Sequence, residues 1–191
     1  MAQSSAATAS GTPLGLFTLA ITTFILGIAF TGLLGAPLTA VTAVISLAFF
    51  YGGLVEILAG TWEFRAGSTL TGTIFCSYAG FWLALGFILW PATGIAKALG
   101  TSLVPVLGYF LLAWTIFTLL ILISVLRTNL ALILFFVLLF VTLLLLTLGL
   151  LLGPGSAVLL TIGGYIGILT AIVAAYTALA IIAGLPVGAR A

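Results

Sequence analysis

Long apolar runs separated by short polar breaks make up most of the chain. The breaks combine Gly, Pro, Asn or charged residues and fall at residues 35–37, 61–67, 91–100, 127–129 and 153–156. Each run between them is long enough for a helix to cross about 30 Å of hydrocarbon. The six runs are residues 14–34, 38–60, 69–90, 103–126, 130–152 and 157–184. The pattern predicts an all-α integral membrane protein with six transmembrane helices.

The composition agrees with this prediction. Hydrophobic residues make up 64% of the 191 residues and charged residues only 3%, whereas a soluble domain carries about 25% charged residues. Residues 1–12 are mostly small and polar and lack the basic residues of a signal peptide, so we expect a disordered cytoplasmic tail. Residues 13–185 then form the six-helix domain, and residues 186–191 form a second short cytoplasmic tail.

The positions of the basic residues set the expected orientation. With a cytoplasmic N-terminus, Arg65, Arg127 and Arg190 lie on the cytoplasmic side and Lys97 lies on the other side. Lys and Arg are enriched in cytoplasmic loops. We therefore expect both termini in the cytoplasm and a location in the plasma membrane.

Small residues recur at every fourth position in the third and sixth spans. Small side chains let helix backbones approach closely, which matters in lipid because apolar burial gives helices little drive to associate. We expect both stripes to be packing surfaces. They comprise Ser68, Gly72, Cys76, Gly80 and Ala84 in the third span and Gly163, Gly167, Ala171 and Ala175 in the sixth.

The residue inventory excludes most catalytic chemistry. The chain has no His, its only acidic residues are Glu56 and Glu63, and it has one Cys and one Met. Catalytic triads need a general base, and metal, haem and iron–sulfur centres need more ligands than these. No basic cluster is present to bind nucleic acid. We therefore expect no enzyme, metal or cofactor, and a role in permeation across the lipid bilayer.

Hydroxyl groups are the main polar groups inside the spans. Thr18, Thr22 and Thr23 lie in the first span and Ser77 lies in the third. Thr18 and Thr22 share a helix face, so they would offer two donors to a small carboxylate in a pore. Alternatively, each hydroxyl bonds the backbone carbonyl one turn earlier. The sequence leaves both interpretations open.

Glu56 is the one charged residue that lies inside an apolar run rather than at its end. An ionisable side chain in hydrocarbon costs about 3 kcal/mol on insertion scales, so it needs a partner, water or a function. Glu56 is either a proton-responsive group beside the path or a carboxyl that extends to the cytoplasmic interface. Glu63 and Arg65 are expected to stay hydrated in the turn that follows.

Motifs from the first to the sixth span follow one family pattern. Residues 13–16 match the end of an Asn-Pro-Ala-Pro-Leu-Gly-Leu signature, and residues 50–53, 59–63 and 77–82 continue the pattern in order. Later matches are residues 114–118, 126–127 and 163–176. Together these segments resemble the acetate uptake transporter family, which includes bacterial succinate-acetate permeases and fungal acetate and ammonia-export proteins. The matched signature residues are Pro13, Leu14, Gly15 and Leu16.

The resemblance implies a six-helix protomer with its own central pore, assembled as a homohexamer. It also implies passage of acetate and related short carboxylates, with succinate included. Tyr78, Leu139 and Leu19 correspond to an apolar constriction in the family. Thr22 and Thr23 correspond to hydroxyls that face the path.

Several positions depart from the family pattern. Leu19 stands where bacterial members have Phe, and Ser10 and Gly11 replace the signature's Asn and first Pro. Glu56 replaces the usual Gln. An amide can donate to a carboxylate whereas an ionised Glu repels it, so either Glu56 is protonated during transport or the preferred substrate differs.

We therefore expect transport of acetate and related short carboxylates, either channel-like or linked to a proton. One alternative is a channel for a neutral small solute such as urea, an amide or ammonia, because a Glu beside a narrow neck suits hydrogen-bond donors. An alternative of another class is a membrane scaffold or sensor that transports nothing. A pore wide enough for a solute would distinguish the transporters from the scaffold.

Overall fold

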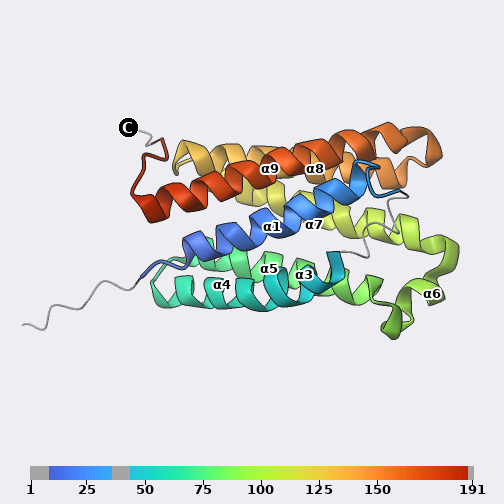
Figure 1. Ribbon diagram of the computed structural model, residues 1–191, viewed down its shortest axis with the longest axis horizontal. Helices are drawn as coiled ribbons and strands as arrows, with labels where there is room; N and C mark the ends of the chain where they lie inside the picture. Colours follow the sequence, from blue (N-terminus) through green and yellow to red (C-terminus); the bar gives the residue numbers. More distant parts are fainter. Residues whose placement is uncertain (1–8, 36–43, 189–191) are drawn as a thin grey trace, which may run out of the picture.

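Six long helices lie side by side in the computed structural model, which describes residues 9–35 and 44–188 (Figure 1). The first is α1 (Thr12–Phe30). The second span, Ile45–Arg65, is built from α3 (Ile45–Phe49), the π-helical segment η2 (Phe50–Val55) and α4 (Glu56–Arg65). The other four are α5 (Thr69–Leu89), α7 (Leu103–Val125), α8 (Leu130–Leu151) and α9 (Ala157–Ala183). All six are long and apolar enough to cross a membrane, which confirms the predicted fold class.

The helix boundaries agree best where the sequence has strong breaks. α8 and α9 end within one residue of the prediction, and α1 begins at residue 12 and ends at residue 30. The predicted end of the second span at residue 60 is wrong, because α4 continues to Arg65 and the turn is only residues 66–68. Gly67 makes this short turn with a φ of +85°. The predicted residues 38–43 of this span lie outside the described residues.

The predicted break at residues 91–100 contains short helical segments. These are η3 (Pro91–Thr93), α6 (Ile95–Leu99) and η4 (Gly100–Ser102), and η5 (Pro154–Ser156) fills the break before α9. Gly94 and Gly100 have φ values of +70° and +52°, which a residue with a side chain rarely adopts. The chain therefore makes these turns at glycines.

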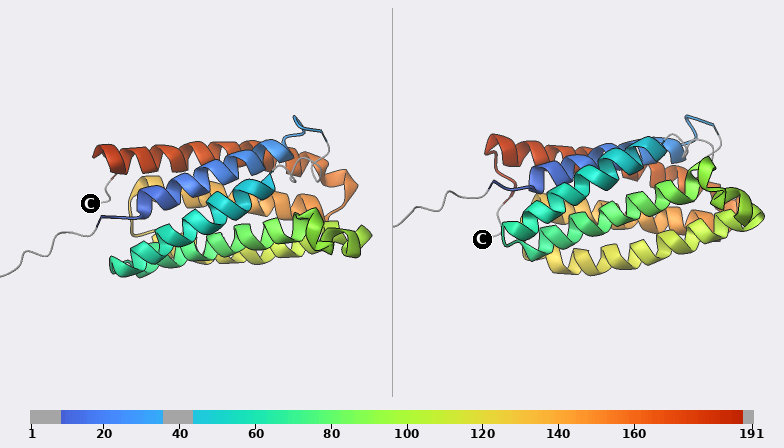
Figure 2. Two further views of the ribbon diagram at one scale, coloured as in Figure 1. Left: turned by 60° about the horizontal axis from the view of Figure 1, so that its bottom comes forward. Right: turned by 90° about the horizontal axis from the view of Figure 1, so that it is seen from below.

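Neighbouring helices contact one another in a closed ring in the order α1, second span, α5, α7, α8 and α9, and α9 packs back onto α1. Figure 2 shows α1 between α9 and the second span from two further sides. α1 runs between the α8–α9 layer and the α4–α5 layer (Figure 1). It therefore contacts both halves of the ring.

Both ends of the described chain lie at the same end of the ring (Figure 1). The Trp62 Nε1 donates to the Ala9 carbonyl at 2.6 Å, and the Leu130 N–H donates to the Gly188 carbonyl at 2.9 Å. Arg65 and Arg127 belong to this end, and Lys97 in α6 belongs to the opposite end. Arg190, the remaining basic residue in the orientation argument, lies outside the described residues.

The contacts between helices are of two kinds. α1 and α9 approach backbone to backbone: a Cβ on Gly27 would lie 2.8 Å from the Gly164 carbonyl oxygen. α5 and α7 instead meet through aromatic rings, with Tyr78 and Phe117 centroids 5.6 Å apart and Phe81 and Trp114 centroids 5.3 Å apart. The ring is thus tight between α1 and α9 and filled by side chains between α5 and α7.

The small-residue stripes pack unequally. In α9, Gly163, Gly167 and Ala171 are buried against neighbouring helices, as predicted. In α5, Gly72 contacts Phe64, but Gly80 is exposed, and nothing lies within 4 Å of the position that a Cβ would take there. Gly80 and Ala84, the last two residues of the α5 stripe, are therefore not packed against another described helix.

We expect Gly164→Ala to destabilise the protein. An added Cβ would lie 2.7 Å from the Gly27 carbonyl oxygen, which is backbone and cannot turn aside. Overpacking of this kind costs about 1–3 kcal/mol, so the midpoint of thermal unfolding of the purified protein should fall. Gly80→Ala is the matched control and should not lower the midpoint, because Ala is more favourable than Gly at an exposed position inside a helix. Equal loss in both variants would contradict the close α1–α9 contact.

Candidate functional site

The residues expected around the constriction lie at one depth in the ring. α1, α5 and α8 begin at the end that holds the chain termini, and α4 ends there. A helix rises 1.5 Å per residue, so four residues lie about 10–14 Å along their helices from that end. They are Leu19, Glu56, Tyr78 and Leu139. Each is buried, with at most 4% of its surface exposed. We call these four residues the neck layer; their part in solute passage remains a prediction.

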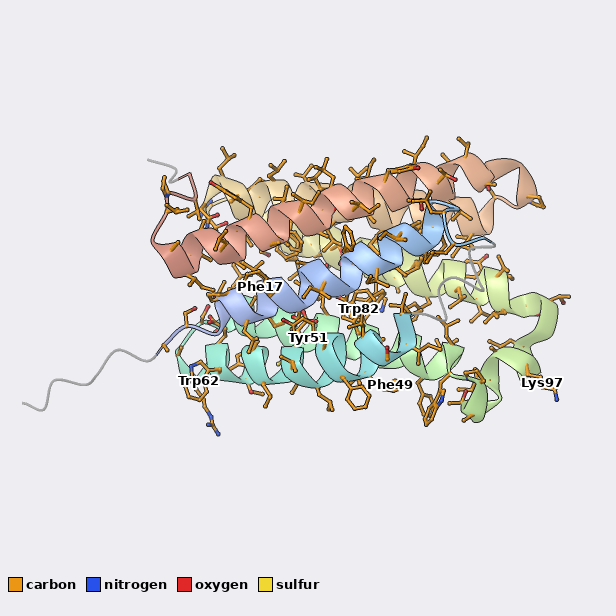
Figure 3. All side chains as sticks on the ribbon, in the orientation of Figure 1. Phe17, Phe49, Tyr51, Trp62, Trp82 and Lys97 are labelled. Carbon is orange, nitrogen blue, oxygen red and sulfur yellow. The ribbon has the colours of Figure 1, made fainter. Side chains whose placement is uncertain are left out.

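Glu56 faces the ring because the glycines one turn away on either side contact α5. A Cβ on Gly52 would lie 2.5 Å from the Trp82 ring, and one on Gly60 would lie 2.5 Å from the Cys76 Sγ. In Figure 3, Trp82 is labelled between the ribbons of α1 and the second span. Glu56 follows directly after the π-helical segment η2, a type of turn often found at functional sites. The surrounding contacts leave its side chain 0% exposed.

The carboxyl group of Glu56 has no hydrogen-bond partner in the part of the chain that the structure describes. Neither oxygen meets a donor among the described residues, and Arg65, Lys97 and Arg127 are all exposed. Burying an ion without a partner is costly, so this environment favours the uncharged carboxyl. The Glu56 side chain is fully buried and does not reach the exposed end of α4, as the alternative interpretation required.

The hydroxyls of Thr18 and Thr22 are bonded within α1. Thr18 Oγ1 donates to the Gly15 carbonyl at 2.7 Å, and Thr22 Oγ1 donates to the Thr18 carbonyl at 2.6 Å. A hydroxyl has one proton, so each keeps only acceptor lone pairs for a solute. Thr23 is also buried, whereas Ser77 on α5 is partly exposed. For Thr18 and Thr22 the structure supports backbone bonding over two free donors.

Hydroxyl pairs that the sequence patterns did not predict join neighbouring helices. The Thr118 hydroxyl donates to the Trp114 carbonyl at 2.6 Å, so Tyr78 is the donor in its own 2.7 Å bond to Thr118. The only signal of these pairs in the sequence is the presence of a few hydroxyl side chains in otherwise apolar helices. The pairs are Tyr78 with Thr118 between α5 and α7, Thr115 with Thr147 between α7 and α8, and Thr142 with Thr170 between α8 and α9.

The signature residues form the first turns of α1. Pro13 stands in the first turn, where its missing N–H costs no helical hydrogen bond. Leu16 is buried, Leu14 is exposed, and Gly15 packs against the Phe75 ring, which would lie 2.5 Å from an added Cβ. The signature therefore packs the start of α1 against α5.

Glu63 holds the segment before α1, which corrects the expectation that it stays hydrated. It is 4% exposed, and its two oxygens accept from the Ser10 hydroxyl at 2.9 Å and the Thr71 hydroxyl at 2.5 Å. Arg65 is exposed and makes no ion pair with Glu63 among the described residues. Gly11 lies against α4, where a Cβ would come 2.8 Å from the Ala59 carbonyl oxygen. The departures at Ser10 and Gly11 therefore fit the surface of α4.

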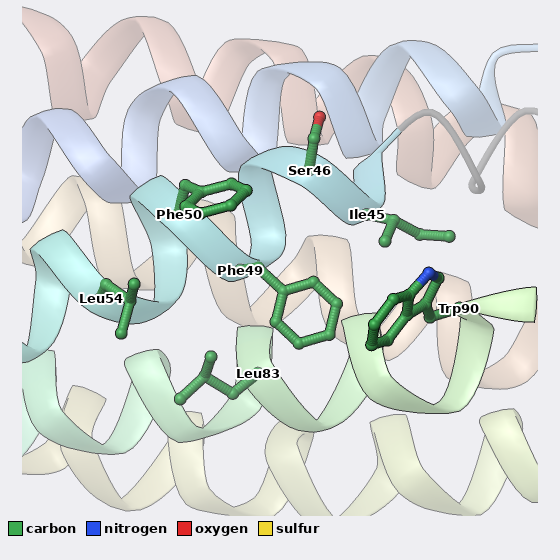
Figure 4. Close-up of a pocket in the computed structure, with 7 residues that line it drawn as sticks. All are labelled: Ile45, Ser46, Phe49, Phe50, Leu54, Leu83 and Trp90. Carbon is green, nitrogen blue, oxygen red and sulfur yellow. The ribbon is translucent and has the colours of Figure 1, made fainter. Parts of the chain in front are cut away.

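An open cavity of about 700 Å³ lies on the outside of the ring between α3, η2 and the end of α5 (Figure 4). Its lining is almost entirely hydrocarbon and aromatic, with Phe49, Phe50 and Trp90 among the lining residues and Ser46 at one edge. Phe50 is 69% exposed. A carboxylate would find almost no polar partner there, so the neck layer is the better candidate site.

The sequence and the fold correspond to those of a known family. The chain matches the GPR1/FUN34/yaaH family over residues 1–185. It belongs to this family. The resemblance to acetate uptake transporters is thereby confirmed, and with it the expected six-helix fold.

Relatives within the GPR1/FUN34/yaaH family carry different descriptions. The chain is 38% identical to acetate permease A of Emericella nidulans and 37% identical to ammonia transport outward protein 2 of Saccharomyces cerevisiae, covering 92% of this chain and 62% of each relative. It therefore spans about three fifths of the length of these relatives. It is 31% identical to the succinate-acetate/proton symporter SatP of Escherichia coli, covering 90% of this chain and 87% of that protein.

A solved structure from the same group has the same fold. The structure of the bacterial acetate channel SatP matches with a TM-score of 0.80 at 30% identity, covering 94% of this chain and 99% of the other. These three relatives and the solved structure are described as transporters or channels, which agrees with the expectation of a permeation protein.

In this family member, we expect Glu63→Ala to release the segment at residues 9–11 from α4. The change removes the acceptor of the Ser10 and Thr71 hydroxyls. With Cys76→Ser as background and Ala9→Cys as the probe, the rate of maleimide labelling should rise severalfold. Arg65→Ala is the control and should not change the rate. An unchanged rate in Glu63→Ala would show that the carboxyl does not hold this segment.

Proposed function

We propose that this chain forms a membrane pore for acetate and related short carboxylates, with succinate as a further substrate. The observation that carries the proposal is the neck layer: a single unpartnered carboxyl beside three apolar neck residues, in a fold that matches a bacterial acetate channel. An apolar neck disfavours hydrated inorganic ions, which would have to lose their water there. A small carboxylic solute needs only a few polar contacts to pass.

On either side of the neck layer, polar atoms of α1 and α5 would contact the solute. The acceptor lone pairs of Thr18 and Thr22, the hydroxyl of Thr23 and the hydroxyl of Ser77 supply these contacts. Passage is channel-like or linked to a proton. The neck itself is closed by packed side chains, so Tyr78 or its apolar neighbours must move for a solute to cross.

We further propose a homohexamer of such protomers in the plasma membrane, with both termini in the cytoplasm. Arg65 and Arg127 at the terminal end of the ring support this orientation, since basic residues are enriched on the cytoplasmic side. Large apolar side chains such as Phe50, Leu58 and Tyr109 are exposed on the protomer, which suits contact with lipid or a neighbouring protomer.

A channel for a neutral solute is the second candidate. The unpartnered carboxyl of Glu56 suits a hydrogen-bond donor such as urea, an amide or ammonia. One relative is described as an ammonia transport outward protein. Substrate measurements therefore have to include a neutral solute.

We expect proteoliposomes of the full chain to take up labelled acetate above the level of empty liposomes, and more at the lower of two pH values. Labelled urea is the parallel substrate. The neck layer combines one carboxyl with apolar side chains, which suits a carboxylic solute, so the rate of acetate uptake should exceed the rate of urea uptake. Uptake of urea without acetate would reject the first candidate in favour of the second.

We expect Glu56→Gln to retain acetate transport and to weaken its pH dependence. Gln is close in shape to Glu and its amide donates a hydrogen bond at any pH, whereas the carboxyl donates only when protonated. The measurement is the ratio of initial acetate rates at the same two pH values, with Glu63→Gln as the matched change of the other acidic residue. Loss of all flux in a correctly assembled Glu56→Gln protein would mean that the carboxyl itself is required.

A further inference from the structure

Two buried polar side chains lack hydrogen-bond partners among the described residues. They are Glu56, through both carboxyl oxygens, and Trp82, through its indole Nε1. Buried polar groups in native proteins are nearly always bonded, so a group left without a bond by the described residues is a candidate contact for a bound solute. One of the two groups is a carboxyl and the other is a pure donor.

Both groups belong to the same junction of α1, the second span and α5. The bare backbone of Gly52 lies against the Trp82 ring and the Thr22 methyl group, at 2.5 Å and 2.9 Å from an added Cβ. Glu56 stands one turn further along the same span, and residues one turn apart have Cβ atoms about 6 Å from each other. The two unbonded groups therefore belong to neighbouring turns at one junction.

The bonding capacity of the two groups defines the complementary solute. The indole N–H donates one bond, and an uncharged carboxyl donates one bond and accepts others. An undissociated carboxylic acid fits this set: its hydroxyl donates to the Glu56 carbonyl oxygen. Its own carbonyl oxygen has two lone pairs, which accept from the Glu56 hydroxyl and from Trp82 Nε1. This pairing leaves no donor unused.

The charges around the site favour the acid over its anion. α1 contributes no titratable side chain, and α5 contributes Cys76 and Tyr78, which are neutral near pH 7. On the second span, Tyr51 is the nearest titratable residue before Glu56, and Arg65 is exposed. With no cation in this part of the described ring, an anion would remain uncompensated.

We infer that Glu56 and Trp82 together form a binding site for the undissociated form of a short carboxylic acid. This inference rests on the proposed function and specifies the form in which the solute crosses the neck. Acetamide shares the required donor and acceptor and fits the same site. Nitromethane has a similar shape but only acceptors, so it cannot donate to the Glu56 carbonyl oxygen.

Infrared difference spectroscopy on the reconstituted full chain tests the inference, with carboxyl-¹³C acetate added at mildly acidic pH. The chain has only two acidic side chains, so the band of a protonated buried carboxyl can be assigned by variants. We expect acetate to shift this band in the wild type. The band should be lost in Glu56→Gln and in Glu56→Leu, and kept in Glu63→Gln.

Trp82→Phe removes one buried donor, so the acetate concentration at which the band shift is half-saturated should rise about tenfold. Trp90→Phe, which changes an exposed tryptophan, should leave it unchanged. Acetamide should compete with acetate for the shift, and nitromethane should not.

The outcomes separate this inference from the proposed function. A preparation that transports acetate while the carboxyl band stays unshifted would overturn the inference alone. Equal effects of Trp82→Phe and Trp90→Phe, or equal competition by acetamide and nitromethane, would also overturn it. No acetate flux above that of empty liposomes would overturn the proposed function itself.

Discussion

In hydrocarbon, a polar side chain must find its hydrogen-bond partner within the protein, because no water is available to replace it. The threonines of the ring meet this requirement by bonding to the carbonyl one turn earlier, as Thr22 and Thr118 do. Their protons are used locally, so the ring is lined by methyl groups and acceptor oxygens. The hydroxyl protons of Thr18 and Thr22 are therefore not available to donate to Glu56.

The two kinds of helix contact give the ring unequal halves. Gly27 and Gly164 let the backbones of α1 and α9 touch, so this contact depends on the absence of side chains. Between α5 and α7 the space is filled by rings, and the Tyr78 hydroxyl is bonded to Thr118 across it. Tyr78 is thus held by side-chain contacts across this boundary, whereas α1 and α9 are held by direct contact of their backbones.

The sequence predicts the six spans because each apolar run ends in glycine, proline, asparagine or charge, which are local signals. It fails at the end of the second span, where Trp62, Glu63 and Arg65 look like a polar loop but continue the helix. Trp62 bonds to Ala9 and Glu63 bonds to Ser10, about fifty residues earlier in the chain, and local patterns cannot reveal such contacts. The same limit applies in the site. The sequence predicts that Thr18 and Thr22 share a helix face. It does not predict whether each hydroxyl donates its proton to a solute or to a backbone carbonyl, because that depends on the geometry of the folded helix.

Position 56 shows how replacing an amide nitrogen by an oxygen changes the hydrogen-bonding chemistry of a buried side chain. The resemblance to acetate uptake transporters implies Gln at this position, and an amide always carries a donor and an acceptor. A carboxyl has the same pair of groups only when it holds a proton. Ionised, it would be a buried anion without a cation among the described residues, at a cost of about 3 kcal/mol on insertion scales. Replacing the amide by an acid therefore makes the hydrogen-bond donor at this position depend on protonation, while the closely similar shape leaves the packing around Gly52 and Gly60 largely unaffected.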